Sequence, residues 1–144
     1  NLPYTPGSRE NLLSYGITKN KIFLSGNPIY EVLNYFKNQI DDSSILDELA
    51  LKNNNYILVT IHRSENVDIK ECLEIIMKAI NEIQYQTSLK IIFSLHPRTE
   101  DKLAKFEIDI SNPQIVFHKP FGFLDFTMLE KNAALVLTDS GTVQ

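Results

Sequence analysis

A histidine, an arginine and a glutamate stand within four positions in the segment His62-Arg63-Ser64-Glu65. An imidazole can exchange a proton or donate to an anion, a guanidinium can hold a phosphate through two parallel hydrogen bonds, and a carboxylate can act as a base. Each also has an ordinary role: His62 as a hydrogen-bonded loop residue, Arg63 as an ion-pair partner of Glu65, and Glu65 as a helix cap. The segment is a candidate site for proton transfer or anion binding.

Two further polar clusters have related chemistry. In Asp139-Ser140-Gly141-Thr142, the glycine allows close approach of the backbone to a ligand, and N–H groups and hydroxyls at a helix start attract phosphate. The alternative is a strand-to-helix turn with an Asp or Ser cap. In His96-Pro97-Arg98 the proline constrains the loop, so that His96 is a possible ligand contact, and Arg98 faces either the ligand or solvent. Anion binding and simple capping both stay open.

Other kinds of site are less well supported. The sequence has neither a Walker A pattern nor G-x-G-x-x-G. The three histidines, His62, His96 and His118, are not at ligand spacing and no cysteine joins them, so we expect no metal site. Phe121, Phe123 and Phe126 are core residues by default, although an aromatic ring beside a nucleotide can stack on its base.

The elements that must position these clusters alternate along the chain. Apolar β-branched runs predict strands at 21–25, 56–61, 90–95, 114–117 and 134–138. Helical patterns occupy 8–15 with Ser8 as its cap, 31–36, 43–51, 68–85, 100–106 and 123–131. This order predicts an α/β fold with a parallel sheet. Because ligands bind beyond the carboxyl ends of parallel strands, the three polar clusters should share one edge.

Length and composition fit one globular domain. The chain has 144 residues, 43% hydrophobic and 22% charged, and its net charge of −4 gives no electrostatic footprint for nucleic acid. No apolar run approaches the roughly 20 residues of a membrane span. The single cysteine, Cys72, excludes a disulfide framework and agrees with a cytoplasmic location. Because residue 1 is Asn and Gln144 follows a loop, we expect a domain excised from a longer protein.

Five segments together resemble one family, the UDP-N-acetylglucosamine 2-epimerases that do not use NAD. The family pattern H-R-x-E-N appears at 62–66, its H-P loop at 96–98, P-x-x-Y/F-x-x-F at 120–126, and T-D-S-G-G/T-x-Q at 138–144. Ser25-Gly26-Asn27-Pro28 resembles the turn near the start of the second domain. The segments occur in order and cover nearly the whole chain, so the combination is specific although single motifs are not.

The resemblance implies a Rossmann-like fold, one half of a GT-B-like enzyme that binds a UDP-sugar between two domains. Residues 1–144 would form a single UDP-binding domain, completed by an N-terminal domain of the same chain. By the same resemblance His62 is catalytic and lies at the diphosphate, and Phe126 lies near the uracil. The implied nucleotide- and phosphate-binding residues are His62, Arg63, Phe126, Ser140, Gly141 and Thr142, with Glu65, His96 and Arg98 as possible members.

The family removes the C2 proton, eliminates UDP to leave a glycal, and adds UDP back to the other epimer. It needs neither NAD nor metal, and it serves bacterial surface polysaccharide synthesis. Three features set this chain apart: two sets of family residues fall outside residues 1–144, and one residue within it is replaced. The proton-transfer carboxylates of the family lie mainly in the N-terminal domain, and its acidic ribose-binding pair would follow Gln144. Thr142 stands where the family more often has a second glycine. In this the chain resembles the branch of the family that acts on 6-deoxy amino sugars.

Other functions remain open at this stage. The chain could belong to a GT-B UDP-sugar glycosyltransferase, or it could be a binding module without chemistry. As an epimerase domain it should bind UDP weakly by itself and catalyse nothing. The expected partners are the UDP-sugar and the N-terminal domain, in a homodimeric parent, without nucleic acid or membrane.

Overall fold

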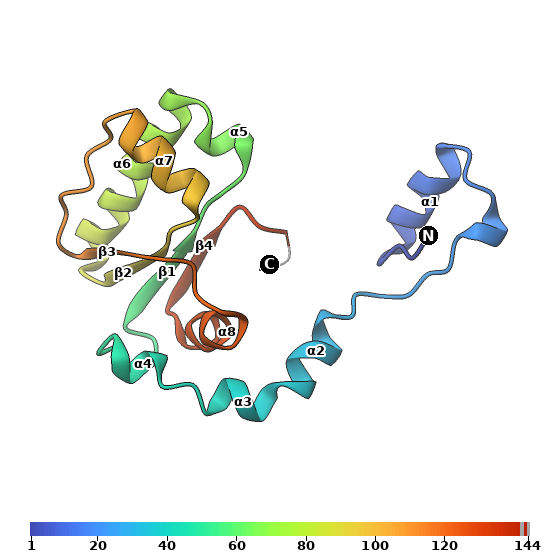
Figure 1. The fold of residues 1–144 in the computed structure, drawn as a ribbon, viewed down its shortest axis with the longest axis horizontal. Coiled ribbons are helices and arrows are strands. Elements are labelled where there is room, and N and C mark those ends of the chain that lie inside the picture. Colours follow the sequence, from blue (N-terminus) through green and yellow to red (C-terminus); the bar gives the residue numbers. More distant parts are fainter. Residues whose placement is uncertain (142, 144) are drawn as a thin grey trace. The chain divides into compact units, whose positions relative to one another are not determined.

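The computed structural model describes residues 1–141 and residue 143, and the chain divides into two units, Asn1–Gln39 and Ile40–Gln144 (Figure 1). The first unit holds α1 (Pro6–Ser14), the 3-10 helix η1 (Lys19–Lys21) and α2 (Ile29–Tyr35). Helix α3 (Lys37–Asp41) spans the boundary between the units. The sheet lies in the second unit.

Two predictions for the first unit are wrong. Thr5, not Ser8, caps α1: the Thr5 hydroxyl accepts the N–H of Ser8 at 3.1 Å, and Pro6 suits the first helical position because it needs no partner for an N–H. The strand predicted over 21–25 is not formed. Phe23 and Ser25 donate their N–H groups to the carbonyls of residues 1 and 3, and these two bonds do not amount to a strand ladder.

The second unit contains one parallel sheet in the order β3-β2-β1-β4, which confirms the predicted α/β class. Its strands are β1 (Tyr56–Thr60), β2 (Lys90–Ser94), β3 (Ile115–His118) and β4 (Leu135–Thr138). The register pairs Thr60 with Thr138 and Ser94 with His118 at the carboxyl ends. Those four residues therefore form a row directly below the loops that carry the polar clusters.

Helices cover both faces of this sheet (Figure 1). Alternate strand residues such as Ile57, Val59 and Phe93 are fully buried in a core with α6 (Lys70–Thr87) and α7 (Pro97–Lys105). The residues between them, such as Leu58 and Ile92, are buried against α4 (Ile45–Glu48) and α8 (Phe123–Asn132). Both faces of the strands are apolar because both are covered, as parallel sheets require.

Two of the predicted helices in this unit have other bounds than their hydrophobic patterns: one is shifted and the other is shorter. The helix predicted over 68–85 begins at Lys70, because Ile69 has an extended backbone (φ −104°, ψ 117°), and it ends at Thr87. A separate short helix, α5 (Ser64–Val67), precedes it. The helix predicted over 43–51 is confined to α4, and Ala50 beyond it has a left-handed backbone (φ 51°). In the part of the chain that the structure describes, no helix is both long and apolar enough to cross a membrane.

One buried polar contact fixes α8 on the sheet. The hydroxyl of Tyr56, at the start of β1, donates to the carbonyl of Leu129 in α8 at 2.5 Å, and neither side chain is exposed. Burial raises the pKa of Tyr56 to about 12. The contact thereby anchors the helix that carries Phe126.

Candidate functional site

The three polar clusters lie at one edge of the sheet, as predicted. His62 follows β1, His96 follows β2 and Ser140 follows β4, and all of these strands run parallel. The rings of His62 and His96 have their centroids 5.7 Å apart, tilted by 34°. Segments distant in sequence thus form one polar surface.

Asp139 joins two of these loops. Its carboxylate accepts the N–H of His62 at 3.1 Å with both oxygens, and its Oδ2 accepts the N–H of Arg63 at 2.9 Å and the side-chain amide of Asn66 at 3.0 Å. Oδ1 also lies 3.4 Å from Nδ1 of the His62 ring. The carboxylate is therefore the central acceptor of the His62 loop.

The electrostatics of Asp139 agree with that role. Burial by itself would raise the pKa of this carboxyl, since its side chain is only 11% exposed. The hydrogen bonds from Asn66, Arg63 and His62, together with the charge interaction with the His62 ring, outweigh burial, and the pKa lies below its ordinary value. Asp139 is thus an ionised acceptor at neutral pH.

The guanidinium of Arg63 lies between two loops. Its NH1 is 3.6 Å from Glu65 Oε1. This is the ion pair that the sequence suggested as the alternative to a ligand contact. A Cβ added to Gly141 would lie 3.7 Å from Arg63 NH2, so the guanidinium is beside the loop after β4. A hydrogen bond to its own backbone N–H, then contacts with Ser64 and Arg63, lower the pKa of Glu65. A carboxyl with a lowered pKa is a weaker base, which does not favour catalysis by Glu65.

His96 has a structural contact of its own. It is the N-cap of α7, and its Nδ1 accepts the N–H of Arg98 at 3.2 Å. The Arg98 side chain turns to Asp68, with NH2 3.4 Å from Oδ2. In α7 the buried hydroxyl of Thr99 donates to the carbonyl of Ile61 at 2.6 Å. These contacts hold the His96 loop against the residue that precedes His62.

Phe126 and the two histidines border the same hollow. A cavity of about 250 Å³ is lined by Thr60, His62, Ser94, His96, Pro120 and Phe126. Phe126 is partly buried on the α8 side of the sheet core. The structure thus brings together an imidazole pair, two hydroxyls and an aromatic ring.

The loop after β4 is described only in part. The N–H of Ser140 donates to the Thr138 hydroxyl at 3.0 Å, and the N–H of Val143 donates to the Ser140 carbonyl at 3.3 Å. Thr142, predicted to bind phosphate, lies outside the described residues. Among the described residues, no three His, Cys, Asp or Glu side chains could together hold a metal ion.

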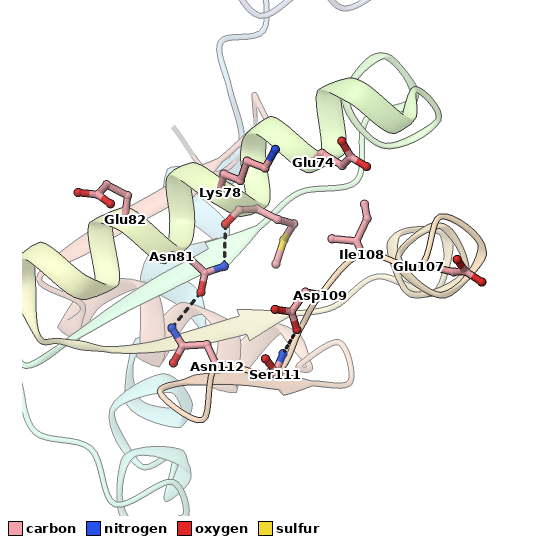
Figure 2. A pocket seen from close by; sticks show the side chains of 10 residues that line it. Glu74, Lys78, Asn81, Glu82, Glu107, Ile108, Asp109, Ser111 and Asn112 are labelled. Atoms are coloured by element: carbon pink, nitrogen blue, oxygen red, sulfur yellow. Dashed lines mark hydrogen bonds between the residues drawn. The ribbon is translucent and has the colours of Figure 1, made fainter.

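A larger cavity, of about 630 Å³, lies elsewhere, between α6 and the segment that precedes β3 (Figure 2). Its polar groups already bond one another: Asn112 donates to Asn81 at 2.9 Å, and the N–H of Ser111 donates to Asp109 at 2.9 Å. None of the predicted site residues lines it. Because the segment before β3 leads into the amino end of that strand, this cavity is distinct from the polar edge.

The role of Asp139 as a link between loops is the feature that the sequence did not reveal. The sequence placed this residue in a polar cluster and in a family segment, and the only role it offered for the side chain was to cap a following helix. The available signal was an acidic residue just after one strand, which could accept the N–H groups of the loop after an adjacent strand. It required knowledge that β4 pairs with β1, and strand order does not follow from the pattern of apolar runs.

The family model described as UDP-N-acetylglucosamine 2-epimerase matches residues 1–144. The chain belongs to this family. It is 42% identical over 144 residues to the UDP-N-acetylglucosamine 2-epimerase of Methanocaldococcus jannaschii, covering 95% of this chain and 39% of that protein. The corresponding enzyme of Campylobacter jejuni is 31% identical, with 100% of this chain and 40% of that protein covered.

Solved structures of UDP-N-acetylglucosamine 2-epimerases have the same fold. The M. jannaschii enzyme, in complex with UDP-GlcNAc and UDP, superimposes with a TM-score of 0.89 at 40% identity, covering 99% of this chain and 40% of that one. The Rickettsia bellii enzyme gives a TM-score of 0.80 at 31% identity, with coverage of 99% and 38%. The chain therefore spans about 40% of the length of these relatives, which fold as GT-B-like proteins.

Proposed function

We propose that this chain is the UDP-binding part of a UDP-N-acetylglucosamine 2-epimerase. The observation that carries the proposal is the shared edge, where His62, Arg63 and the Ser140 loop surround one ionised carboxylate, in a fold similar to a structure solved with UDP-GlcNAc and UDP. The N–H groups of His62 and Arg63 already donate to Asp139, so the groups that suit a diphosphate are the Arg63 guanidinium beside Gly141 and the half-exposed imidazole of His62.

The proposed binding mode assigns a role to each part of the edge. The diphosphate contacts His62, Arg63 and the loop 140–142, and the uracil lies near Phe126. His62 acts in proton transfer, since its ring borders the cavity and its side chain is 41% exposed. His96 is a second contact at the cavity. Arg98 is a weaker candidate because it pairs with Asp68.

The proposed reaction is epimerisation at C2 of a UDP-N-acetylhexosamine, by elimination and re-addition of UDP, without NAD or metal. A domain that precedes this chain in the complete enzyme supplies the carboxylates for C2. This chain alone binds UDP weakly and is inactive, because a base must lie within hydrogen-bond reach of the proton it removes. We place the complete enzyme in the cytoplasm as a homodimer that makes precursors of surface polysaccharides.

The sugar is a separate question. A relative in Pseudomonas aeruginosa, 37% identical over 89 residues, is named UDP-2,3-diacetamido-2,3-dideoxy-D-glucuronate 2-epimerase, so different UDP-sugars occur among the relatives. Thr142 favours a UDP-6-deoxy-N-acetylhexosamine as the second candidate. A GT-B glycosyltransferase is the third.

Isotope incorporation tests the proposal. The complete enzyme is incubated with UDP-GlcNAc, and in parallel with a 6-deoxy analogue, in deuterated water containing a chelator and no NAD. Deuterium at C2 of the recovered sugars is expected. Epimer formation without deuterium contradicts the elimination mechanism, and UDP release only on addition of an acceptor sugar indicates a glycosyltransferase.

A further inference from the structure

We propose that Asp139 is a positioning residue for His62: its carboxylate holds the imidazole with a proton on Nδ1, so that protons are exchanged only at Nε2. The nearest carboxylate oxygen lies 3.4 Å from Nδ1. An ionised carboxylate can only accept hydrogen bonds, so the ring nitrogen that faces it is favoured as a donor. The free histidine side chain prefers the other tautomer, with the proton on Nε2.

The carboxylate is itself held in place, which it must be to select a tautomer. The N–H groups of His62 and Arg63 and the side-chain amide of Asn66 all donate to it. Three donors from the loop that carries the ring fix the direction of both oxygens. The lowered pKa of Asp139 supports an ionised acceptor at neutral pH.

The consequence for chemistry lies at the other ring nitrogen. The two nitrogens of an imidazole point in divergent directions, so Nε2 is directed away from Asp139. With Nδ1 occupied, a neutral ring accepts a proton on Nε2, and the resulting imidazolium donates that proton to an anion and returns to its starting state. Besides Asp139, the ring lies beside that of His96 and borders the cavity that Thr60 and Ser94 also line. The role toward a phosphate rests on the proposed function, whereas the tautomer does not.

His96 provides a reference within the same molecule. Its Nδ1 accepts the N–H of Arg98, so its neutral ring carries the proton on Nε2. The two rings, 5.7 Å apart, should therefore be opposite tautomers. A general disturbance of the edge would affect both rings, but a change in Asp139 should affect His62 alone.

The variant Asp139→Asn gives a directional test. The oxygen of the new amide would take the place of Oδ2, which receives bonds from Arg63 and Asn66, and its NH₂ group would then face Nδ1. Nδ1 would become an acceptor and the proton would move to Nε2. An amide in the equivalent place of a Ser-His-Asp triad produces the wrong tautomer in this way.

The test is two-bond ¹H–¹⁵N correlation spectroscopy of the ¹⁵N-labelled chain without UDP, with both rings neutral. The wild type should show His62 mainly protonated at Nδ1 and His96 at Nε2. Asp139→Asn should reverse His62 only, and Asp101→Asn, at an exposed carboxylate on α7, should change neither ring. A wild-type His62 protonated at Nε2, or a His62 tautomer unchanged by Asp139→Asn, would overturn the proposal. Failure to bind UDP in a separate titration would instead contradict the proposed function.

Discussion

The carboxylate of Asp139 accepts the backbone N–H of His62 at 3.1 Å with each of its oxygens. The contact joins the ends of two neighbouring strands, β4 and β1, beyond the last pair in their ladder, Thr60 and Thr138. The His62 loop and the Ser140 loop are therefore set relative to each other before any ligand binds. Such preorganisation lowers the entropic cost of ordering a site on binding.

Removal of the Asp139 charge should make the fold less stable, and in a pH-dependent way. The pKa of Asp139 is lower in the folded chain than the ordinary value of about 3.9, so the folded state favours the ionised form. Its contribution is complete above about pH 4–5 and is lost as the pH falls through the lowered pKa. We expect Asp139→Asn to reduce the free energy of unfolding by about 1–3 kcal/mol at pH 7.

Urea unfolding at pH 7 and in the acid range measures this. The difference between wild type and Asp139→Asn should shrink as the pH falls below about 4. Asp101→Asn removes an exposed carboxylate on α7 and should leave the pH dependence near that of the wild type. A constant difference at all pH values would contradict an ionised Asp139 as the cause.

The hydroxyl of Thr99 should be important for the stability of the edge. It donates to the Ile61 carbonyl at 2.6 Å and is fully buried, whereas the hydroxyl of Thr87 makes a similar 2.7 Å bond to Ile83 at an exposed position. Thr99→Val leaves a buried carbonyl without its donor and should cost about 1–3 kcal/mol. In Thr87→Val, water replaces the lost donor. Equal losses in the two variants would mean that burial does not govern the effect.

Gly141 should be replaceable for folding but not for binding. A Cβ there would meet only Arg63 NH2, at 3.7 Å, so Gly141→Ala should change the free energy of unfolding by less than about 0.5 kcal/mol. The methyl group would nevertheless keep a phosphate from the backbone, and we expect about tenfold weaker UDP binding, the loss of one hydrogen bond to a charged group. Gly7→Ala, in α1, is the matched control for calorimetric titration. Unchanged affinity in Gly141→Ala would remove this loop from the phosphate site.

The sequence was sufficient for the sheet and for the shared edge. Uninterrupted apolar runs such as 56–61, each ending in a polar cluster, are typical of parallel strands buried on both faces, and His62 and His96 lie where that pattern placed them. Local pattern failed at 21–25, where Phe23 and Leu24 look like strand residues but are exposed and form no strand. Strand formation depends on a partner elsewhere in the chain, which a local pattern does not reveal.

Contacts within the site were predictable only where they are local. The Arg63–Glu65 ion pair lies within three residues and was considered from sequence. The Asp139–His62 contact spans 77 positions and depends on the strand order. The pairing of Arg98 with Asp68 likewise requires that α7 lie beside the start of α6.

Titration of UDP into the ¹⁵N-labelled chain tests the central claim most directly, that the polar edge of the sheet binds the nucleotide. Amide signals of His62, Arg63, Ser140 and Gly141 should shift, with weak affinity, and His62→Ala should weaken binding by about tenfold or more, as expected for one charge-assisted contact. The contradicting result is equal affinity in the two proteins, or shifts confined to the distant cavity around Asn81 and Asn112.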